Sequence, residues 1–473
     1  MKKLWMSAVL LLVLLDAQAQ GLSLQDCRAL AIENNKKLKI ADEQIISSRA
    51  KKAEAFTKYL PGIDAMGTYM RNQKEINLLS EDAHLPVFTF DPTAGTYRPA
   101  IVTKPDGTPV MGANGQPLFQ QFALLPKDAM TVDDRNTAVL QVGLTQPVYM
   151  GGKIRAYNKL AGLSEQLAVS GREQELQEVI QSVDETYWQV VSLINRKELA
   201  GKYVEALTRF QRDVEIMHKT GVATKADVLS VRVKLNEAEM LQTKVEDGLS
   251  LSRMLLNQLC GLRTDTVFQL KEQIIGEPLQ VKEMVLEEVY KNRPEVISLE
   301  LATEIYKKKE KIARSEYLPS VALMANYIAM TPSFFDGIST KLDGMWSVGI
   351  GVKAPMFHWG ASRKSVRDAR AQTSIMNYKL QDAREKIELQ VSQSQFKIKE
   401  VARKLKMAET NMERADENLK FAKLGFQEGT IPVLNVLEAQ TAWLSAHSEL
   451  IDTRIEVKLC EVYLQKAYGI LGK

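Results

Sequence analysis

The sequence is poor in the residues that build catalytic and metal-binding sites. It has only four histidines and three cysteines, all far apart along 473 residues: His84, His218, His358, His447, Cys27, Cys260 and Cys460. No nucleotide-binding loop, dinucleotide fingerprint or serine-hydrolase elbow is present. We therefore expect no enzyme, no metal site and no cofactor, with the cysteines as buried free thiols. The 18 methionines form no cluster along the chain, so we expect them to pack in the core.

Long apolar runs are also missing. Beyond the first residues, no stretch of about 18 apolar residues occurs, so we expect no transmembrane helix in the mature chain. The chain begins with Met1-Lys2-Lys3, an apolar stretch and Ala17-Gln18-Ala19, which is typical of a secretory signal peptide over residues 1–19. The mature protein would then be periplasmic, secreted or inserted in the outer membrane as a closed β-barrel.

The chain carries no excess of charge of either sign. Its 62 basic and 58 acidic residues give a net charge of +4. A nucleic-acid-binding surface depends on a strong positive field, so we expect no nucleic-acid partner. Charged residues make up 25% of the chain, which suits long helices with solvated faces.

An internal repeat organises the chain. Tyr59-Leu60-Pro61 recurs as Tyr317-Leu318-Pro319, at an offset of 258 residues. Later landmarks recur at an offset of 208 residues: Pro147 and Pro355, Gly152 and Gly360, Gly221 and Gly429, Gly261 and Gly469. The pattern predicts a unit of helix, strand, strand, helix, tip and helix, present twice. We place the copies at residues 20–261 and 284–473, with a linker or equatorial segment over residues 262–283.

The first copy carries 50 additional residues between Pro61 and Pro147. Seven of the fifteen prolines lie in residues 72–136, together with the turn dipeptides Asp106-Gly107 and Asn114-Gly115. This composition predicts one long exposed loop that could carry a small hairpin of its own.

Four segments alternate apolar and polar residues, as β-strands do. Two precede Pro147 and Pro355, over residues 138–145 and 346–353, and two follow the Tyr-Leu-Pro motifs, over residues 63–71 and 321–329. The alternation is typical of lipid-facing strands in a barrel, and a half-buried strand of a soluble sheet is the alternative. Because a small barrel needs about eight strands, we expect oligomerisation, most simply a trimer with twelve strands.

Two blocks without proline, residues 148–277 and 356–431, predict continuous helices, since an interior proline costs about 3 kcal/mol. Apolar residues from Leu176 to Met217 recur at spacings of three and four with one slip, a coiled-coil pattern. Gly221 and Gly429 end the first helices of two hairpins, with tips at residues 219–229 and 427–437. An ordinary dimeric coiled coil is the alternative, but the strand pair tied to each hairpin disfavours it.

Taken together, these features resemble the TolC-like outer-membrane efflux proteins. The resemblance covers nearly the whole mature chain and rests on motifs that occur twice: Tyr-Leu-Pro before each first strand, the Pro-x-x-x-Gly-Gly and Pro-x-x-x-x-Gly exits, and Gly-x-x-x-x-x-(Asp/Asn)-Val-Leu at the tips. It implies a mainly α fold with transmembrane β: a homotrimer with a twelve-stranded barrel in the outer-membrane lipid of a Gram-negative bacterium, continued by a long α-helical periplasmic barrel. The additional loop would be extracellular. The junction between barrel and helices would lie at Pro147, Gly151, Gly152, Pro355 and Gly360.

The resemblance also implies a function. The chain would be a passive exit duct for small-molecule or drug efflux, powered by an inner-membrane pump through a periplasmic adaptor protein. A type I protein-secretion duct has the same architecture and is an alternative; a periplasmic coiled-coil adaptor or structural protein is an alternative of another class. The adaptor would contact the tips at Gly221, Val222, Ala223, Thr224, Gly429, Thr430 and Ile431.

Members of the family narrow the tunnel mouth with acidic residues after the second tip. The matching positions are Asn435 and Glu438, of which only Glu438 is charged. Three copies of Glu438 around a threefold axis would favour cations and impede anions, and an ordinary solvated glutamate is the alternative. Phe426 and Ile431 occupy positions where some members carry a Tyr and an Arg that lock the mouth, so the resemblance implies no polar lock here.

Overall fold

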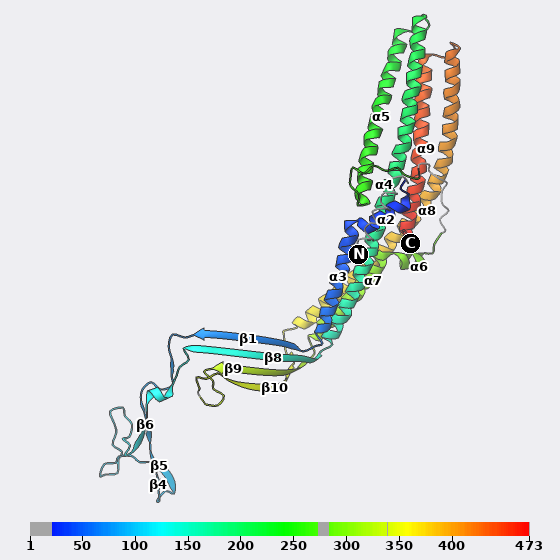
Figure 1. Cartoon of the computed structure of the whole chain (residues 1–473). Helices are drawn as coiled ribbons and strands as arrows, with labels where there is room; N and C mark the ends of the chain where they lie inside the picture. Colours follow the sequence, from blue (N-terminus) through cyan, green and yellow to red (C-terminus); the bar gives the residue numbers. More distant parts are fainter. Residues whose placement is uncertain (1–20, 273–282, 338, 473) are drawn as a thin grey trace, which may run out of the picture. The chain divides into compact units, whose positions relative to one another are not determined.

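The computed structural model of the chain describes residues 21–272, 283–337 and 339–472 (Figure 1). The expected signal peptide, residues 1–19, and residues 273–282 of the expected linker lie outside the described residues. The chain forms two compact units. Residues 56–154 and 314–362 make the strand unit; the described residues up to 55, with 155–313 and those from 363 onward, make the helical unit.

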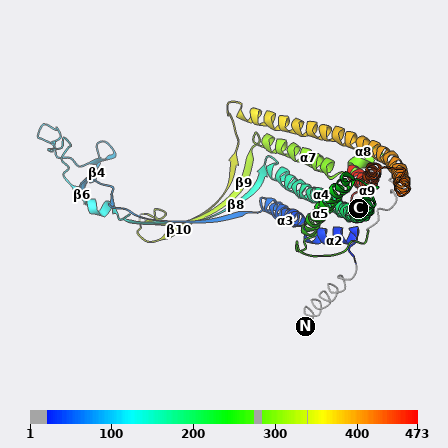
Figure 2. The same cartoon turned by 90° about the horizontal axis from the view of Figure 1, so that it is seen from above.

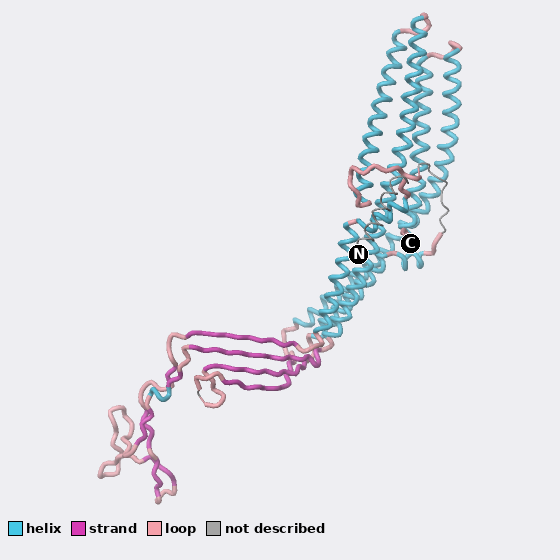
Figure 3. Tube along the Cα trace, viewed as in Figure 1, coloured by secondary structure: helices cyan, strands magenta, loops and turns pink. Residues whose placement is uncertain are grey.

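The strand unit contains one antiparallel sheet of four strands, drawn in magenta in Figure 3, in the order β1-β8-β9-β10. The strands are β1 (Gly62–Arg71), β8 (Asn136–Met150), β9 (Ser320–Thr331) and β10 (Asp343–Lys353). Each repeat contributes one pair of strands, and the two pairs meet where β8 bonds to β9. β1 and β10 are therefore the edges of the sheet, each with a row of backbone groups that no strand of the sheet pairs.

β8 is longer than the sequence predicts. We expected the strand to end before Pro147 and a helix to follow, but β8 continues to Met150. Its register with β9 shifts between Pro147 and Tyr149. Proline cannot donate a ladder hydrogen bond, so within a sheet it is confined to edges and to irregularities of this kind. The start of the proline-free block is thus strand rather than helix.

The two faces of the sheet differ in composition. Cross-strand pairs such as Ile63 with Leu144 and Ala325 with Val348 place apolar residues in rows. We call this side the apolar face; it carries Ile63, Tyr69, Leu140, Val142, Leu144, Leu323, Tyr327, Trp346, Val348, Ile350 and Val352. In the single chain most of these side chains are uncovered, and Trp346 is 74% exposed. The opposite side, the polar face, carries Asp64, Thr68, Gln141, Asn326, Asp343 and Ser347.

The additional segment of the first repeat is more ordered than a loop. We expected at most one small hairpin, but three two-stranded ladders are present: β2 (Ile76–Asn77) with β7 (Thr131–Val132), β3 (Ala83–Pro86) with β6 (Phe122–Leu125), and β4 (Phe88–Asp91) with β5 (Thr96–Pro99). A 3-10 helix, η1 (Lys127–Met130), precedes β7. The first two ladders join the outgoing and returning arms of the segment. The backbone groups of the two arms therefore pair with one another.

Eight helices occur in the described residues (Figures 1 and 2): α2 (Leu24–Asn34), α3 (Lys36–Thr57), α4 (Lys153–Lys219), α5 (Lys225–Leu259), α6 (Leu286–Asn292), α7 (Pro294–Ser315), α8 (Ala361–Gln427) and α9 (Val433–Tyr468). Each repeat begins with two helices rather than the one expected. The breaks fall at Asn35, whose backbone is extended, and at Arg293, which precedes a proline and is therefore disfavoured in a helix. α4 and α8 have 67 residues each, or about 100 Å at 1.5 Å per residue.

The long helices α4, α5, α8 and α9 share one hydrophobic core near the tips, which includes Leu207, Val231 and Val436. We expected the methionines to pack in the core, and Met217 and Met284 do pack against it as partly buried residues. Among the described residues no methionine is fully buried. Within the described part of the chain, no helix is both long enough and apolar enough to cross a membrane.

α2 is held against α4 by an ion pair. The Arg28 guanidinium donates two hydrogen bonds, of 2.7 and 2.5 Å, to the buried carboxylate of Asp184. The three cysteines are buried and free, which confirms the expectation. The pKa of the Cys27 thiol is raised, mainly by a hydrogen bond with Cys260 and secondly by burial. The thiol therefore stays protonated.

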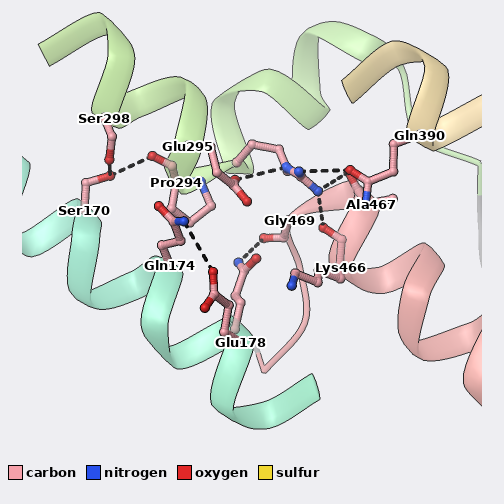
Figure 4. Close-up of polar contacts among 12 residues, drawn as sticks. Ser170, Gln174, Glu178, Pro294, Glu295, Ser298, Gln390, Lys466, Ala467 and Gly469 are labelled. Atoms are coloured by element: carbon pink, nitrogen blue, oxygen red, sulfur yellow. Dashed lines mark hydrogen bonds and ion pairs between the residues drawn. The ribbon is translucent and has the colours of Figure 1, made fainter. Parts of the chain in front are cut away.

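Arg293 joins three helices, and Figure 4 labels its partners Glu295, Gln390 and Lys466. Its Nη1 donates to the carbonyl of Lys466 in the last turn of α9 (2.8 Å), and its Nη2 donates to Gln390 Oε1 on α8 (3.1 Å). Its Nε forms an ion pair with Glu295 at the start of α7 (3.1 Å), and the residue is only 5% exposed. A cation beside the last carbonyls of a helix satisfies them and complements the helix dipole. This side chain therefore fixes the C-terminal end of α9 to the first helices of the second repeat.

α4 joins the same cluster through two side chains (Figure 4). Ser170 Oγ donates to the carbonyl of Pro294 (2.9 Å) and accepts from Ser298 Oγ (2.9 Å). Gln177 Nε2 donates to the carbonyl of Gly469 (3.2 Å), just beyond α9. The cluster thus connects helices of both repeats.

The substitution Arg293→Met should lower the free energy of unfolding by about 2–3 kcal/mol, because it removes charge-assisted hydrogen bonds from a buried site. Urea unfolding followed by circular dichroism measures this as a lower midpoint. Arg263→Met is the control, since Arg263 is exposed and bonds only Asp265 among the described contacts, and its effect should stay within about 0.5 kcal/mol. Equal midpoints for the two variants would contradict the assigned role.

Candidate functional site

The first tip is the turn between α4 and α5. α4 ends at Lys219, and Gly221 takes a left-handed backbone with φ of 82°, which glycine adopts at little cost. The backbone N–H of Val222 then donates to the carbonyl of Met217 (2.9 Å). Thr224 caps α5 by accepting from the N–H of Asp227 (3.1 Å), and the Asp227 carboxylate accepts from the N–H of Thr224 (2.9 Å). This reciprocal capping box defines the turn.

The second tip, between α8 and α9, repeats the geometry with different residues. Gly429 has φ of 72°, and the N–H of Thr430 donates to the carbonyl of Gly425 (2.8 Å). Pro432 occupies the position before α9 without a side-chain cap. Ile431 packs over Gly425, where a larger residue would collide with it. Both tips are therefore closed by the same backbone device.

The predicted tip residues divide into an exposed and a buried group. Val222 is 68% exposed, and Gly221, Thr224, Gly429 and Thr430 are also exposed. Ala223, in contrast, is 9% exposed and packs in the core of the long helices. Ile431 is half-buried and packs against the same core. The surface available to a partner at the tips is consequently narrower than the sequence motif indicates.

An aromatic pair lies directly beneath the tips. Phe426 on α8 is buried and meets Phe210 on α4 edge to face, with ring centroids 5.0 Å apart. The resemblance pointed to this position as the place of a missing polar lock. The structure shows instead an apolar contact within the chain that joins the two hairpins.

Each hairpin is also held by a carboxylate. Glu215 on α4 accepts from Arg232 on α5 (2.8 Å) and from Gln211 (2.9 Å), and these bonds hold the pKa of the Glu215 carboxyl below its usual range. Asp416 on α8 accepts from Trp443 Nε1 on α9 (2.6 Å) and lies 3.0 Å from His447 Nε2. The two helices of each hairpin are thereby fixed to one another below the tips.

Asn435 and Glu438 lie on one exposed side of α9, three residues apart. Glu438 borders a groove between α5 and α9 with a volume of about 790 Å³, which is lined mainly by Leu229, Val233, Lys234, Leu434 and Thr441. The Lys234 ammonium donates to Glu237 (2.8 Å) rather than to Glu438. The carboxylate of Glu438 thus lies at an exposed surface near the second tip.

The predicted junction residues fall in the strand unit. Pro147 lies inside β8, while Pro355 follows β10. Gly151, Gly152 and Gly360 all have positive φ, of 60°, 79° and 76°. At Gly151 a Cβ atom would also lie 2.8 Å from Leu318 Cβ and 2.9 Å from the carbonyl of Ser315, so only glycine fits. These residues turn the chain between strand and helix.

The sequence analysis did not predict two rows of exposed apolar residues. The apolar stripe of α8 consists of Tyr378, Leu389, Phe396, Met407 and Phe421, and the apolar stripe of α5 consists of Leu229, Val233, Met240, Leu251 and Met254. Their spacings on α8 are 11, 7, 11 and 14 residues, too long for a search at spacings of three and four. Among the described residues no group of three or more His, Cys, Asp or Glu could hold a metal ion.

Comparison with known proteins places the sequence in context. It matches the family described as outer membrane efflux protein over residues 109–262 and 285–470. The solvent efflux pump outer membrane protein SrpC of Pseudomonas putida is 23% identical over 354 residues, covering 73% of this chain and 74% of SrpC. The cation efflux system protein CusC of Escherichia coli is 24% identical over 184 residues, covering 37% of this chain and 38% of CusC. The crystal structure of VceC from Vibrio cholerae has a TM-score of 0.72 at 13% identity, covering 94% of this chain and 96% of VceC.

Proposed function

The chain belongs to the outer membrane efflux protein family, and we propose that three copies of it form one passive exit duct. It is an outer-membrane channel whose helical part is periplasmic. In our proposal an inner-membrane pump supplies the energy and a periplasmic adaptor protein joins pump and duct. Efflux of small molecules is favoured over protein secretion because relatives carry names for solvent and cation efflux.

The open sheet carries the proposal. Its edges β1 and β10 have unpaired backbone groups, and its apolar face is uncovered. All backbone N–H and C=O groups in lipid must be paired, so a sheet with an open edge is not stable there. Further copies can close the edges by pairing β10 of one copy with β1 of the next. With four strands per copy, three copies give twelve strands, enough to enclose a channel.

The apolar stripes support the same assembly from the helical side. At about 100° per residue, the α8 stripe lies within about 20° of one line, and the α5 stripe lies within about 30° of another. Spacings of 7 and 11 residues average 3.6 per turn, so both lines stay on one side of a straight helix. A contact between the α5 stripe of one copy and the α8 stripe of the next is heterologous, and such contacts generate closed rings.

Replacing Phe396 with Asp should disrupt the trimer, because it puts a carboxylate in the middle of the α8 stripe. Native mass spectrometry or light scattering in detergent would then report smaller species. Lys420→Asp is the control, since Lys420 is exposed on α8 about 120° away from the stripe. Circular dichroism should be unchanged in both variants. A trimer that persists with Asp at position 396 would refute the stripe contact.

We place the selectivity of the mouth at Glu438. Three copies of this carboxylate would raise the local cation concentration, as rings of Asp or Glu do in cation channels. Asn435, one helical turn earlier, would add polar but uncharged groups. Phe426 takes no part in this gate, because its ring is engaged with Phe210.

The variant Glu438→Gln should weaken the cation preference of single channels in planar bilayers. A cation about 4 Å from a carboxylate in water gains about 1 kcal/mol, so the cation-to-anion permeability ratio should fall about fivefold. The control Glu417→Gln removes the same charge from an exposed position on α8 and should leave the ratio unchanged. If both variants retain the parent ratio, Glu438 is an ordinary solvated glutamate.

We place adaptor contact at the exposed residues of the two tips. Val222 offers an apolar side chain, and Thr224 and Thr430 offer hydroxyl groups. Gly221 and Gly429 allow close approach of a partner backbone. Ala223 and Ile431 pack in and against the core, so in our proposal they support the exposed tip residues and do not contact the adaptor themselves.

A photo-crosslinking residue at Val222 should form an adduct with the adaptor in the assembled complex, because this side chain points to solvent at the tip. The same residue at Lys386, exposed on α8 about 40 positions before the second tip, should form none. Adducts are detected by gel shift and mass spectrometry. An assembled complex without an adduct at Val222 would exclude docking at this tip.

A further inference from the structure

The methionines of the sheet are unevenly distributed between its two faces. Met66 is paired with Gln141, Gln141 with Ile328, and Ile328 with Met345, so this row lies on the polar face. The same register places further methionines on the polar face: Met70, Met324 and Met330. None of these five lies on the apolar face. Residues scattered over both repeats thus gather on one side of one sheet.

The location is unusual for an apolar side chain. The polar face also carries the carboxylates of Asp64 and Asp343 and the amides of Gln141 and Asn326. Met345 is 51% exposed there and Met330 is half-buried. If the apolar face meets lipid, as the proposed function requires, the polar face borders the water-filled channel. Packing in a core cannot explain methionines in this position.

Met330, Met345 and Asp343 lie close together, at the end of β9 and the beginning of β10. Met330 is directly opposite Asp343, and Met345 is two residues farther along β10 on the same face. Met330 and Met345 are therefore diagonal neighbours, a relation in which long side chains can reach one another.

Another methionine of the sheet shows how far such a side chain reaches across a diagonal of this kind. Met324 is opposite Gly349, which makes Gly351 its diagonal neighbour in the same sense as Met345 is to Met330. The Met324 sulfur lies 3.4 Å from the position that a Cβ atom at Gly351 would occupy. The register gives Met330 and Met345 the same diagonal relation, so their side chains are close enough for both thioethers to approach one ion.

Asp343 keeps coordination capacity. Its Oδ1 accepts from the N–H of Gly344 (2.7 Å), whereas the contact found for Oδ2 among the described residues is a long one of 3.5 Å with Ser333 Oγ. Thioethers are soft ligands that select Cu(I) and similar ions, while carboxylate, carbonyl and water ligands suit Mg²⁺ and Ca²⁺. Two thioethers with one carboxylate therefore match a soft monovalent cation and are poor for hard divalent ions.

We propose that Met330, Met345 and Asp343 form a binding site for a soft monovalent cation, Cu(I) or Ag(I), on the polar face of the sheet. The site rests on the proposed function only in its placement beside the channel, because all three residues belong to one chain. A cation bound weakly here would be concentrated near the exit. The site would give the duct a preference among the small solutes that pass through it.

Silver binding to the purified full-length chain in detergent tests the site. Ag⁺ is added as nitrate in chloride-free buffer, and bound metal is measured by equilibrium dialysis and mass spectrometry. The double variant Met330→Leu/Met345→Leu should lose one bound Ag⁺ per chain, and Asp343→Asn should weaken that site about 10- to 100-fold. Met356→Leu is the control, since Met356 is exposed outside the sheet. The three buried thiols are common to all variants and cancel in the comparison.

Leucine keeps the volume and apolarity of methionine, so the substitution removes little but the sulfur. Equal Ag⁺ stoichiometry and affinity in the parent and the double Leu variant would overturn the proposal. A second result would also overturn it: export of an apolar dye is lost when the methionines are replaced by Gln but not by Leu, while silver binding is unaffected. The methionines would then serve as an apolar lining of the channel. Bilayer conductance of the parent chain is scored separately. Its absence would refute the duct but leave the silver result standing.

Discussion

Hydrogen bonding at the edges of the sheet is the constraint on which the rest of this structure depends. The four strands of one chain form an antiparallel sheet in the order β1-β8-β9-β10. The outer backbone groups of β1 and β10 have no partner strand in this sheet. In water such edges invite association, and in lipid they are excluded. The apolar face of the sheet and the apolar stripes of α5 and α8 also lack a covering partner in the single chain, here for their side chains rather than for backbone groups. In the proposed assembly, another copy of the chain covers each of these surfaces.

Much of the fold could be predicted because its signals are local. Alternation with period two marks the four strands, and the absence of proline marks the long helices, without any knowledge of what they contact. The left-handed glycines at positions 221 and 429 end helices for a reason that lies in their own backbone. Even the free, buried cysteines followed from their spacing.

The remaining features depend on contacts between distant residues. The pairing of Pro86 with Phe122 in the additional segment has no local signature. The sequence therefore predicts a long loop with at most a small hairpin, where the structure has three ladders. The same holds at the tips. Ala223 and Val222 are adjacent in the sequence, but the fold of the hairpin buries one and exposes the other. Phe426 becomes a structural contact only because Phe210, on the other hairpin, meets it.

The position of the methionines follows from the division of the sheet into an apolar and a polar face. Along the chain Met66 and Met345 are 279 positions apart, and neither signals a site. Strand alternation allows each of them one of two faces, and the need for an apolar surface toward lipid decides which face that is. Once Ile63 and Val348 take the lipid side, Met66 and Met345 must take the other. In the proposed assembly, the alternation that turns the apolar face toward lipid also places these thioethers beside the path of the solute, although no spacing rule in the sequence would have grouped them.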